Sequence, residues 1–163
     1  MRPHRALQRA LAGCIKGADG HADLEREDPS LARWNQKKMD WEQGKVDVWA
    51  SFPGVPLAFL VDVTIRSSEA ERYGGSGSWL DKATQEKTAR YGTTVCCLAY
   101  GTMGRASTHA QRALYRMAEA AATSRCQQER SKAMFVAWQQ VLQRAVIWSE
   151  IDVALPALGR WRR

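Results

Sequence analysis

An aspartate inside an apolar run constrains the fold of this chain more than any other feature. The run LAFLVDVTI covers residues 57–65, and Asp62 is its only charged residue. Side chains alternate between the two faces of a strand, so Val61 and Val63 would share one face. Asp62 and Thr64 would share the other. Because an ionised carboxylate is costly to bury without a partner or a metal ion, the run predicts a buried strand that supplies Asp62 with one of these.

A second run repeats this arrangement a short distance upstream. In KVDVWAS, residues 45–51, Asp47 stands between two valines that would occupy the opposite face of a strand. The two runs are joined by FPGVP, a turn built from proline and glycine. If the two runs pair as a hairpin, both Asp47 and Asp62 can point into one cleft.

The pair of aspartates leaves two interpretations open. Two close carboxylates repel each other and favour a hard divalent cation between them, typically Mg²⁺. Alternatively, each aspartate caps a turn or pairs with an arginine such as Arg66. A single aspartate favours the second interpretation, whereas a pair on neighbouring strands favours neither.

A lysine lies on the apolar face of the helix that is expected over residues 78–91. A helix brings residues three and four positions apart onto one face, and this face comprises Leu80, Ala83, Lys87 and Tyr91. An inward-facing lysine can extend along its methylene stem to reach solvent. It can instead meet the two carboxylates, where its charge would hold a water molecule or a phosphate oxygen.

The other segments of the chain predict further helices and one more strand, so we expect a single α/β domain that covers residues 1–163. Residues 17–30 are rich in glycine and acids and predict a loop, and Gly44 is expected to end the helix that follows this loop. The other expected elements are a buried strand at 93–100 and helices at 2–12, 30–42, 107–125 and 129–149.

The balance of charge limits the partners. The formal net charge of +7 favours a polyanionic partner, either nucleic acid or an anionic membrane surface. No apolar stretch approaches the roughly 20 residues needed to cross a bilayer, so we expect no membrane partner. The glycine-rich segment 74–77 lacks the GK[ST] ending of a nucleotide-binding loop, and we expect no nucleotide cofactor.

Cysteine usage indicates the compartment. Cys96 and Cys97 are adjacent in an apolar run, which predicts free thiols in a reducing environment. We therefore expect an intracellular protein, and a nuclear one if the source is a eukaryote. The histidines His4 and His21 have no evident partner in the sequence.

Three motifs in fixed order carry a resemblance to a known family. They are KVD at 45–47, Asp62 within LVDVTI, and EKTARY at 86–91. Their order and spacing resemble the restriction-like endonuclease domain of certain site-specific non-LTR retrotransposons, a branch of the PD-(D/E)xK nuclease group. The resemblance covers about residues 40–107, the nuclease-like core, and the matching positions are Lys45, Asp47, Asp62, Glu86, Lys87, Arg90 and Tyr91.

The chain departs from the family pattern at several positions. Val46 replaces a proline, and Thr64 stands where many relatives carry the lysine of the ExK motif. The retrotransposon branch resembles this chain in placing that lysine on the following helix, which makes Lys87 the candidate. The zinc knuckle that often precedes the domain is missing, because Cys14 and His21 do not make a four-ligand set.

The resemblance implies a restriction-endonuclease-like α/β fold, a small mixed sheet flanked by helices, with extra C-terminal helices in this chain. It implies Mg²⁺- or Mn²⁺-dependent hydrolysis of DNA, with the metal held by Asp47 and Asp62. Lys87 would orient the attacking water, and Glu86 would be either a further ligand or a solvent-facing residue. Glu42 is a weaker ligand candidate. The residues expected to bind nucleic acid are Lys45, Arg66 and Arg90.

Two alternatives accompany the nuclease hypothesis. The chain could be a non-catalytic DNA-binding remnant that keeps the fold and the basic surface. It could also be an interaction protein in which the C-terminal helices mediate dimerisation, so a homodimer is among the expected partners.

Overall fold

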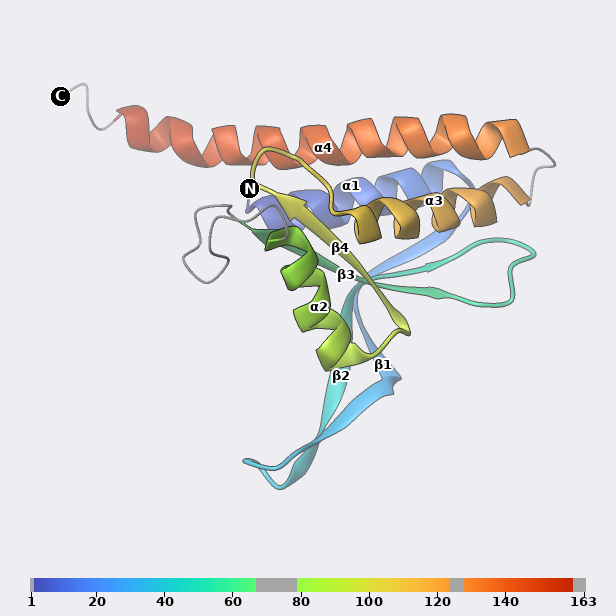
Figure 1. The fold of residues 1–163 in the computed structure, drawn as a ribbon, viewed down its shortest axis with the longest axis vertical. Coiled ribbons are helices and arrows are strands. Elements are labelled where there is room, and N and C mark those ends of the chain that lie inside the picture. The colour runs from blue at the N-terminus through green and yellow to red at the C-terminus, as the bar shows by residue number, and fades with distance from the viewer. Residues whose placement is uncertain (1, 67–78, 124–127, 160–163) are drawn as a thin grey trace.

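A four-stranded mixed sheet organises the protein (Figure 1). The computed structural model describes residues 2–66, 79–123 and 128–159. Its elements in chain order are α1 (Pro3–Gly17), β1 (His21–Asn35), β2 (Asp40–Ser51), β3 (Phe59–Arg66), α2 (Trp79–Tyr91), β4 (Val95–Gly101), α3 (Thr108–Thr123) and α4 (Gln128–Gly159). The strands lie in the order β1-β2-β3-β4. The expected α/β class with a small mixed sheet is therefore confirmed.

The sheet combines two kinds of pairing. β1, β2 and β3 form an antiparallel meander, and β4 pairs with β3 in parallel. Parallel neighbours need a crossover connection, and α2 supplies it. The expected hairpin of the two aspartate-bearing runs is present as β2 and β3, with Val48 opposite Val61.

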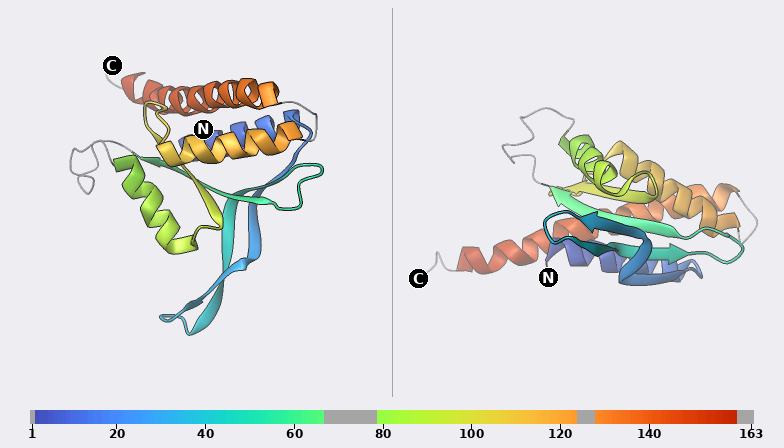
Figure 2. Two further views of the ribbon diagram at one scale, coloured as in Figure 1. Left: turned by 45° about the vertical axis from the view of Figure 1, so that its right-hand side comes forward. Right: turned by 90° about the horizontal axis from the view of Figure 1, so that it is seen from below.

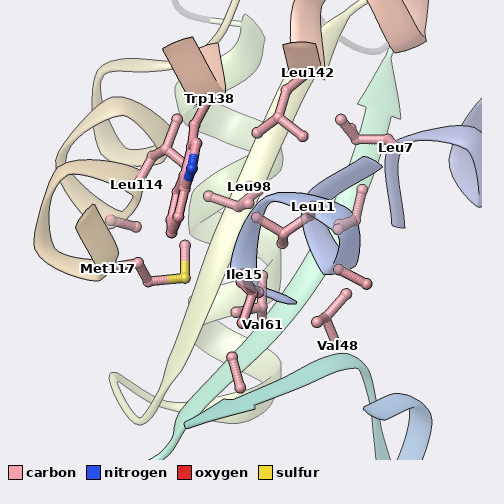
Figure 3. Packing of buried hydrophobic residues seen from close by; sticks show 14 of the residues in the cluster. Leu7, Leu11, Ile15, Val48, Val61, Leu98, Leu114, Met117, Trp138 and Leu142 are labelled. Atoms are coloured by element: carbon pink, nitrogen blue, oxygen red, sulfur yellow. The ribbon is translucent and has the colours of Figure 1, made fainter. Parts of the chain in front are cut away.

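Helices cover both faces of the sheet (Figures 1 and 2). α1, α3 and α4 lie on one face, where they enclose the main hydrophobic core. Figure 3 shows Leu7 and Leu11 of α1, Leu114 of α3 and Trp138 of α4 converging on Leu98 of β4. On the other face, α2 packs Leu80 and Ala83 against Cys97 and Ala99 of β4.

The loop expected at 17–30 and the helix expected at 30–42 are wrong. Residues 21–35 form β1, and β2 begins at Asp40. Pro29 disfavours helical geometry for Asp28, and the ladder with β2 shifts register between Asp28 and Arg33, where an edge strand tolerates proline. Ser30 does not cap a helix, because its N–H and its hydroxyl both donate to Asp28 Oδ1. Tertiary pairing therefore overrides a weak helical preference.

Gly44 lies inside β2 instead of ending a helix. A Cβ atom at this position would lie 2.1 Å from the Cβ atom of Leu31 and 2.4 Å from its carbonyl oxygen. Leu31 packs across Gly44 into a small cluster with Val46 and Leu60. Only a residue without a side chain leaves room for this crossing.

The other helices and strands begin and end closer to the residues expected from the sequence. The largest differences are at α1, which continues to Gly17, and at α4, which continues to Gly159. The glycine-rich segment 74–77 and residues 160–163 lie outside the described part of the chain, as does Cys126. Cys14, Cys96 and Cys97 are free thiols. Among the helices that the structure describes, none has the length and apolarity needed to span a membrane.

The crossing at Gly44 gives the first prediction. Gly44→Ala would force Leu31 and its backbone aside, and we expect a loss of about 1–3 kcal/mol or more in the free energy of unfolding. The control is Gly13→Ala on α1, where nothing lies within 4 Å of an added Cβ atom. Alanine favours a helix, so the control should gain up to about 1 kcal/mol. Urea unfolding of both variants measures this, and equal stability would contradict the packing described.

Candidate active site

The backbone ladder between β2 and β3 gives way to side-chain contacts at Asp47. The paired residues run from Ala50 and Phe59 to Val48 and Val61. Next along β3, the Val63 N–H donates to Asp47 Oδ2 at 2.6 Å. The carboxylate thus occupies the place that a backbone carbonyl would take in a continued ladder, and it satisfies a buried donor.

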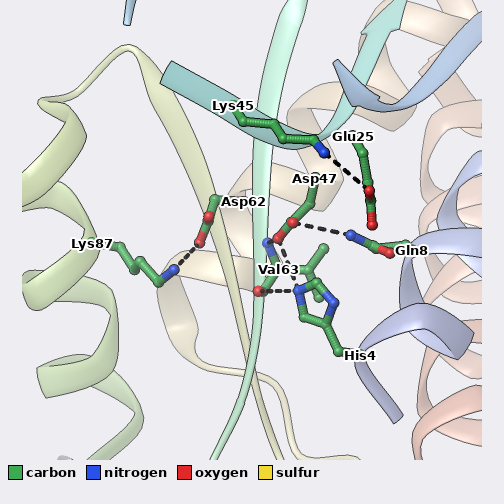
Figure 4. Close-up of polar contacts among 8 residues, drawn as sticks. All are labelled: His4, Gln8, Glu25, Lys45, Asp47, Asp62, Val63 and Lys87. Carbon is green, nitrogen blue, oxygen red and sulfur yellow. Dashed lines mark hydrogen bonds and ion pairs between the residues drawn. The ribbon is translucent and has the colours of Figure 1, made fainter. Parts of the chain in front are cut away.

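Two side chains of α1 hold this carboxylate (Figure 4). Gln8 Nε2 donates to Asp47 Oδ1 at 3.0 Å. His4 Nε2 lies 3.1 Å from Asp47 Oδ2 and 3.1 Å from the Val63 carbonyl oxygen. Because both of these partners are acceptors, His4 carries a proton on Nε2. Asp47 and His4 together satisfy both backbone groups of Val63 and attach α1 to the opened sheet.

The charges of this contact reinforce each other. Burial raises the pKa of Asp47, but the hydrogen bonds from His4 and from the Val63 N–H outweigh it and hold that pKa below its usual value. The hydrogen bond to Asp47 is also the main reason why the pKa of His4 is raised, against the opposing effect of burial. Asp47 is therefore ionised at neutral pH, and His4 is more basic than a free histidine.

Asp62 meets Lys87 on the other side of β3. The Lys87 Nζ atom lies 2.8 Å from Asp62 Oδ2, so the lysine does not simply extend to solvent. Asp62 is only 4% exposed, and among the described residues its Oδ2 atom has this ion pair and no further hydrogen-bond partner. Burial raises the pKa of Asp62, Lys87 offsets this effect only in part, and the charge of Asp47 raises it further.

The shared cleft considered from the sequence is not what the structure shows, because the two aspartates lie on neighbouring strands but turn to different helices. Figure 4 shows Asp47 directed toward His4 and Gln8 of α1, and Asp62 directed toward Lys87 of α2. Their charges nonetheless interact, since Asp47 contributes to the raised pKa of Asp62. The result is a strip of charge that runs across β3 and joins both helices.

Two carboxylates alone would leave most of the coordination shell of a divalent cation to water or to substrate oxygens. In the part of the chain that the structure describes, no group of three or more His, Cys, Asp or Glu side chains is placed to hold a metal ion. Mg²⁺ commonly uses one or two carboxylates and completes its shell with waters and substrate phosphates. Asp62 would supply one of these carboxylates through its buried Oδ2 atom, which lies beside the Lys87 ammonium. Asp47 can contribute through Oδ1, where Gln8 is its partner.

The structure does not bring the other ligand candidates to this strip. Glu86 is exposed, and its Oε2 atom lies 3.6 Å from Arg66 Nη2. Of the two roles considered for Glu86, metal ligand or solvent-facing residue, its position fits the second. Glu42 lies on the β1–β2 hairpin, where it pairs with Lys38 at 2.8 Å and with Arg33 at 3.3 Å. The hydrogen bond from Lys38 is the largest cause that lowers the pKa of Glu42 to about 2.

Two of the three expected nucleic-acid contacts lie together. Lys45 and Arg90 line a hollow of about 380 Å³ between β2 and the end of α2. Lys45 also pairs with Glu25 at 3.1 Å, and Arg90 lies over the ring of Tyr91. Arg66 does not line this hollow and instead pairs with Glu86.

His4 and Gln8 were not identified from the sequence as partners of Asp47. His4 was expected to have no partner, and that expectation is wrong, as it is for His21, which lies 3.0 Å from Asp23. The only available signal was their spacing of four residues, which places both side chains on one face of α1. No known family model matches this chain, and no curated protein matches its sequence.

The His4–Asp47 contact predicts a pH dependence of stability. Because the pKa of His4 is raised in the folded state, its contribution is complete below the unfolded value near 6.5. It is lost as the pH rises through the folded-state pKa. We expect His4→Gln to flatten this decline in unfolding free energy above about pH 6.5.

The control is His109→Gln, which changes an exposed histidine on α3. Urea unfolding at a series of pH values should show the parental decline in this variant. A decline that is equally steep in His4→Gln would contradict the role assigned to His4.

Proposed function

We propose that this protein is a metal-dependent DNA endonuclease in which Asp47, Asp62 and Lys87 form the active centre. The observation that carries the proposal is the buried carboxylate of Asp62, whose pKa is raised although its Oδ2 atom lies 2.8 Å from Lys87 Nζ. Such a group lowers the stability of a fold. Perturbed carboxylates of this kind are concentrated at functional sites.

The architecture supports the proposal. The resemblance implies a small mixed sheet flanked by helices, with carboxylates on two adjacent strands and a lysine from the following helix. β2, β3 and α2 supply Asp47, Asp62 and Lys87 in that order. A restriction-endonuclease-like fold is therefore the finer assignment that we propose for this α/β domain.

The chemistry assigned to each residue follows from its surroundings. Mg²⁺ or Mn²⁺ bound by Asp47 and Asp62 would polarise the scissile phosphate and lower the pKa of a bound water. Lys87 places a positive charge beside Asp62, where it can stabilise charge that develops on the phosphate oxygens. His4 and Gln8 act as positioning residues, because they hold the Asp47 carboxylate.

DNA is the partner that the charge of the chain favours. The net charge is +7, and Lys45 and Arg90 line the hollow beside the hairpin base. Cations placed along a backbone track supply most of the affinity for nucleic acid. An intracellular location, nuclear in a eukaryote, is consistent with this partner.

A second candidate is a DNA-binding domain without catalysis. It is favoured by the three hydrogen bonds that Asp47 already accepts, from Gln8, His4 and Val63, which suit a structural role. Homodimerisation stays a prediction. The surface that would mediate it is formed by the exposed apolar side chains of α4, which are Val136, Val141, Ile147 and Trp148.

Lys87 separates catalysis from binding. Lys87→Ala would remove a preorganised charge, and the rate of single-turnover DNA cleavage should fall by about 10²- to 10³-fold. Binding should change little, since one charge among many phosphate contacts contributes a small part of the affinity. Lys82→Ala, an exposed lysine on the same helix, is the matched control and should cleave at the parental rate.

A cleavage rate in Lys87→Ala equal to that of the parent would make the lysine a structural residue and remove it from the site. Thr64 shares the strand face of Asp62 and is buried. We therefore expect the double variant Lys87→Ala, Thr64→Lys to recover part of the rate.

Metal binding should be visible in stability. A cation that relieves the repulsion between Asp47 and Asp62 binds only the folded state, so Mn²⁺ should raise the melting temperature. Asp62→Asn should abolish this rise while leaving the fold intact, and Asp81→Asn, an exposed aspartate on α2, should retain it. A parent protein whose melting temperature does not respond to Mn²⁺ would count against the metal site.

A further inference from the structure

We propose that the outer part of the β1–β2 hairpin is an arm that binds duplex DNA beside the candidate active site. The arm comprises residues 33–42. The inference rests on the proposed function only in taking DNA as the partner, and it does not require catalysis. It concerns a region in which the sequence predicted a helix.

The arm extends beyond the packed body of the protein. Figures 1 and 2 show the hairpin projecting from the sheet, away from the helical layer of α1, α3 and α4. Six residue-to-residue steps lead from Met39 to Lys45, a length of about 20 Å at 3.3 Å per step. The three core clusters include Leu31 of β1 but none of residues 33–42. Core packing therefore does not explain the arm.

The tip of the arm presents large apolar side chains to solvent. Trp34 and Trp41 are cross-strand partners whose rings meet edge to face at 5.9 Å. Trp41 is 62% exposed and Met39 is 73% exposed. Exposed aromatic and methionine side chains gathered at one place indicate a binding surface, because such a surface is unfavourable in water. In nucleic-acid-binding proteins, apolar side chains such as methionine insert between base steps, and aromatic rings stack on bases.

Cations connect the tip to the candidate active site. A second hollow of about 360 Å³ lies along the tip and is lined by Arg33, Trp34 and Lys37. Arg33 and Glu42 line both this hollow and the one that holds Lys45 and Arg90. We call these two hollows together the recess; cations line both of them, beside the carboxylates of Glu27 and Glu42.

A duplex fits this recess better than a protein or a membrane does. β1 is the edge strand, and its charged run from Glu25 to Asp28 opposes the addition of a further protein strand. A bilayer surface would meet the tip but not the recess at the hairpin base. A two-stranded ribbon fits the major groove of B-DNA, and about 20 Å corresponds to roughly six base pairs at 3.4 Å each.

The test is duplex binding in EDTA, where cleavage cannot interfere. Fluorescence anisotropy would measure the affinity for a labelled duplex of about 20 base pairs at several salt concentrations. Trp41→Ala should weaken binding by about five- to 100-fold, the range for a side chain that contacts bases. Its control is Trp148→Ala on α4, on the far side of the molecule from the tip, where the tryptophan is 63% exposed.

A charge reversal tests the recess. Lys37→Glu should weaken binding and reduce by about one the slope of log affinity against log salt concentration. Lys132→Glu, which changes an exposed lysine on α4, should leave this slope near the parental value.

A shortened hairpin provides a third variant. In it, an Asn-Gly turn replaces residues 34–41 and joins Arg33 to its partner Glu42. We expect it to fold with a parental melting temperature and to bind duplex as weakly as Trp41→Ala or more weakly.

Each outcome decides the proposal independently of catalysis. Weaker duplex binding by the three arm variants, with parental binding by both controls, supports the arm even if the parent never cleaves DNA. Equal effects of Trp41→Ala and Trp148→Ala would overturn it. So would binding of anionic vesicles or of single strands only, or an affinity for duplex that the shortened hairpin does not change.

Discussion

The hydrogen bond from the Val63 N–H to Asp47 Oδ2 is the contact on which the rest of the site depends. At this point a side chain replaces a backbone carbonyl, so β2 and β3 separate while the buried donor stays satisfied. The separation lets His4 of α1 reach the Val63 carbonyl, which fixes the helix against the sheet. Asp62, the next residue back along β3, then faces α2, where Lys87 meets it. A single side-chain acceptor, used in place of a backbone carbonyl, thereby positions charged groups from two strands and two helices.

The charges in this strip have unequal effects on stability. Asp47 accepts hydrogen bonds from α1 and from the backbone, and its lowered pKa shows that the folded protein stabilises its ionised form. Asp62 has the opposite balance, because burial outweighs the attraction of Lys87. A fold that keeps an unfavourable carboxylate beside a favourable one has the pattern expected of an active centre, where stability is traded for reactivity. The pairing therefore links the packing of the sheet to the proposed hydrolysis.

The sequence predicted those features that depend on local periodicity. Alternation placed Asp62 on the strand face opposite its neighbouring valines, and helical spacing placed Lys87 on the inward face, so their approach was one of the two alternatives that the sequence left open. The partners of Asp47 were not accessible, because His4 lies 43 residues away and meets it only after α1 packs. The β1–β2 hairpin was missed for a related reason. Its strand geometry comes from pairing with β2 and from the crossing of Leu31 over Gly44, while its local composition resembles a loop and a capped helix.

The central claim is that the strip formed by Asp47, Asp62 and Lys87 hydrolyses DNA. Incubation of the parent protein with supercoiled plasmid in Mg²⁺, analysed for nicked and linear products, tests it most directly. We expect products to accumulate with time and to be absent when EDTA replaces Mg²⁺ or when Asp62→Asn replaces the parent. Plasmid that stays supercoiled under conditions in which the parent protein binds it in Mg²⁺ would contradict the claim and leave a DNA-binding domain in its place.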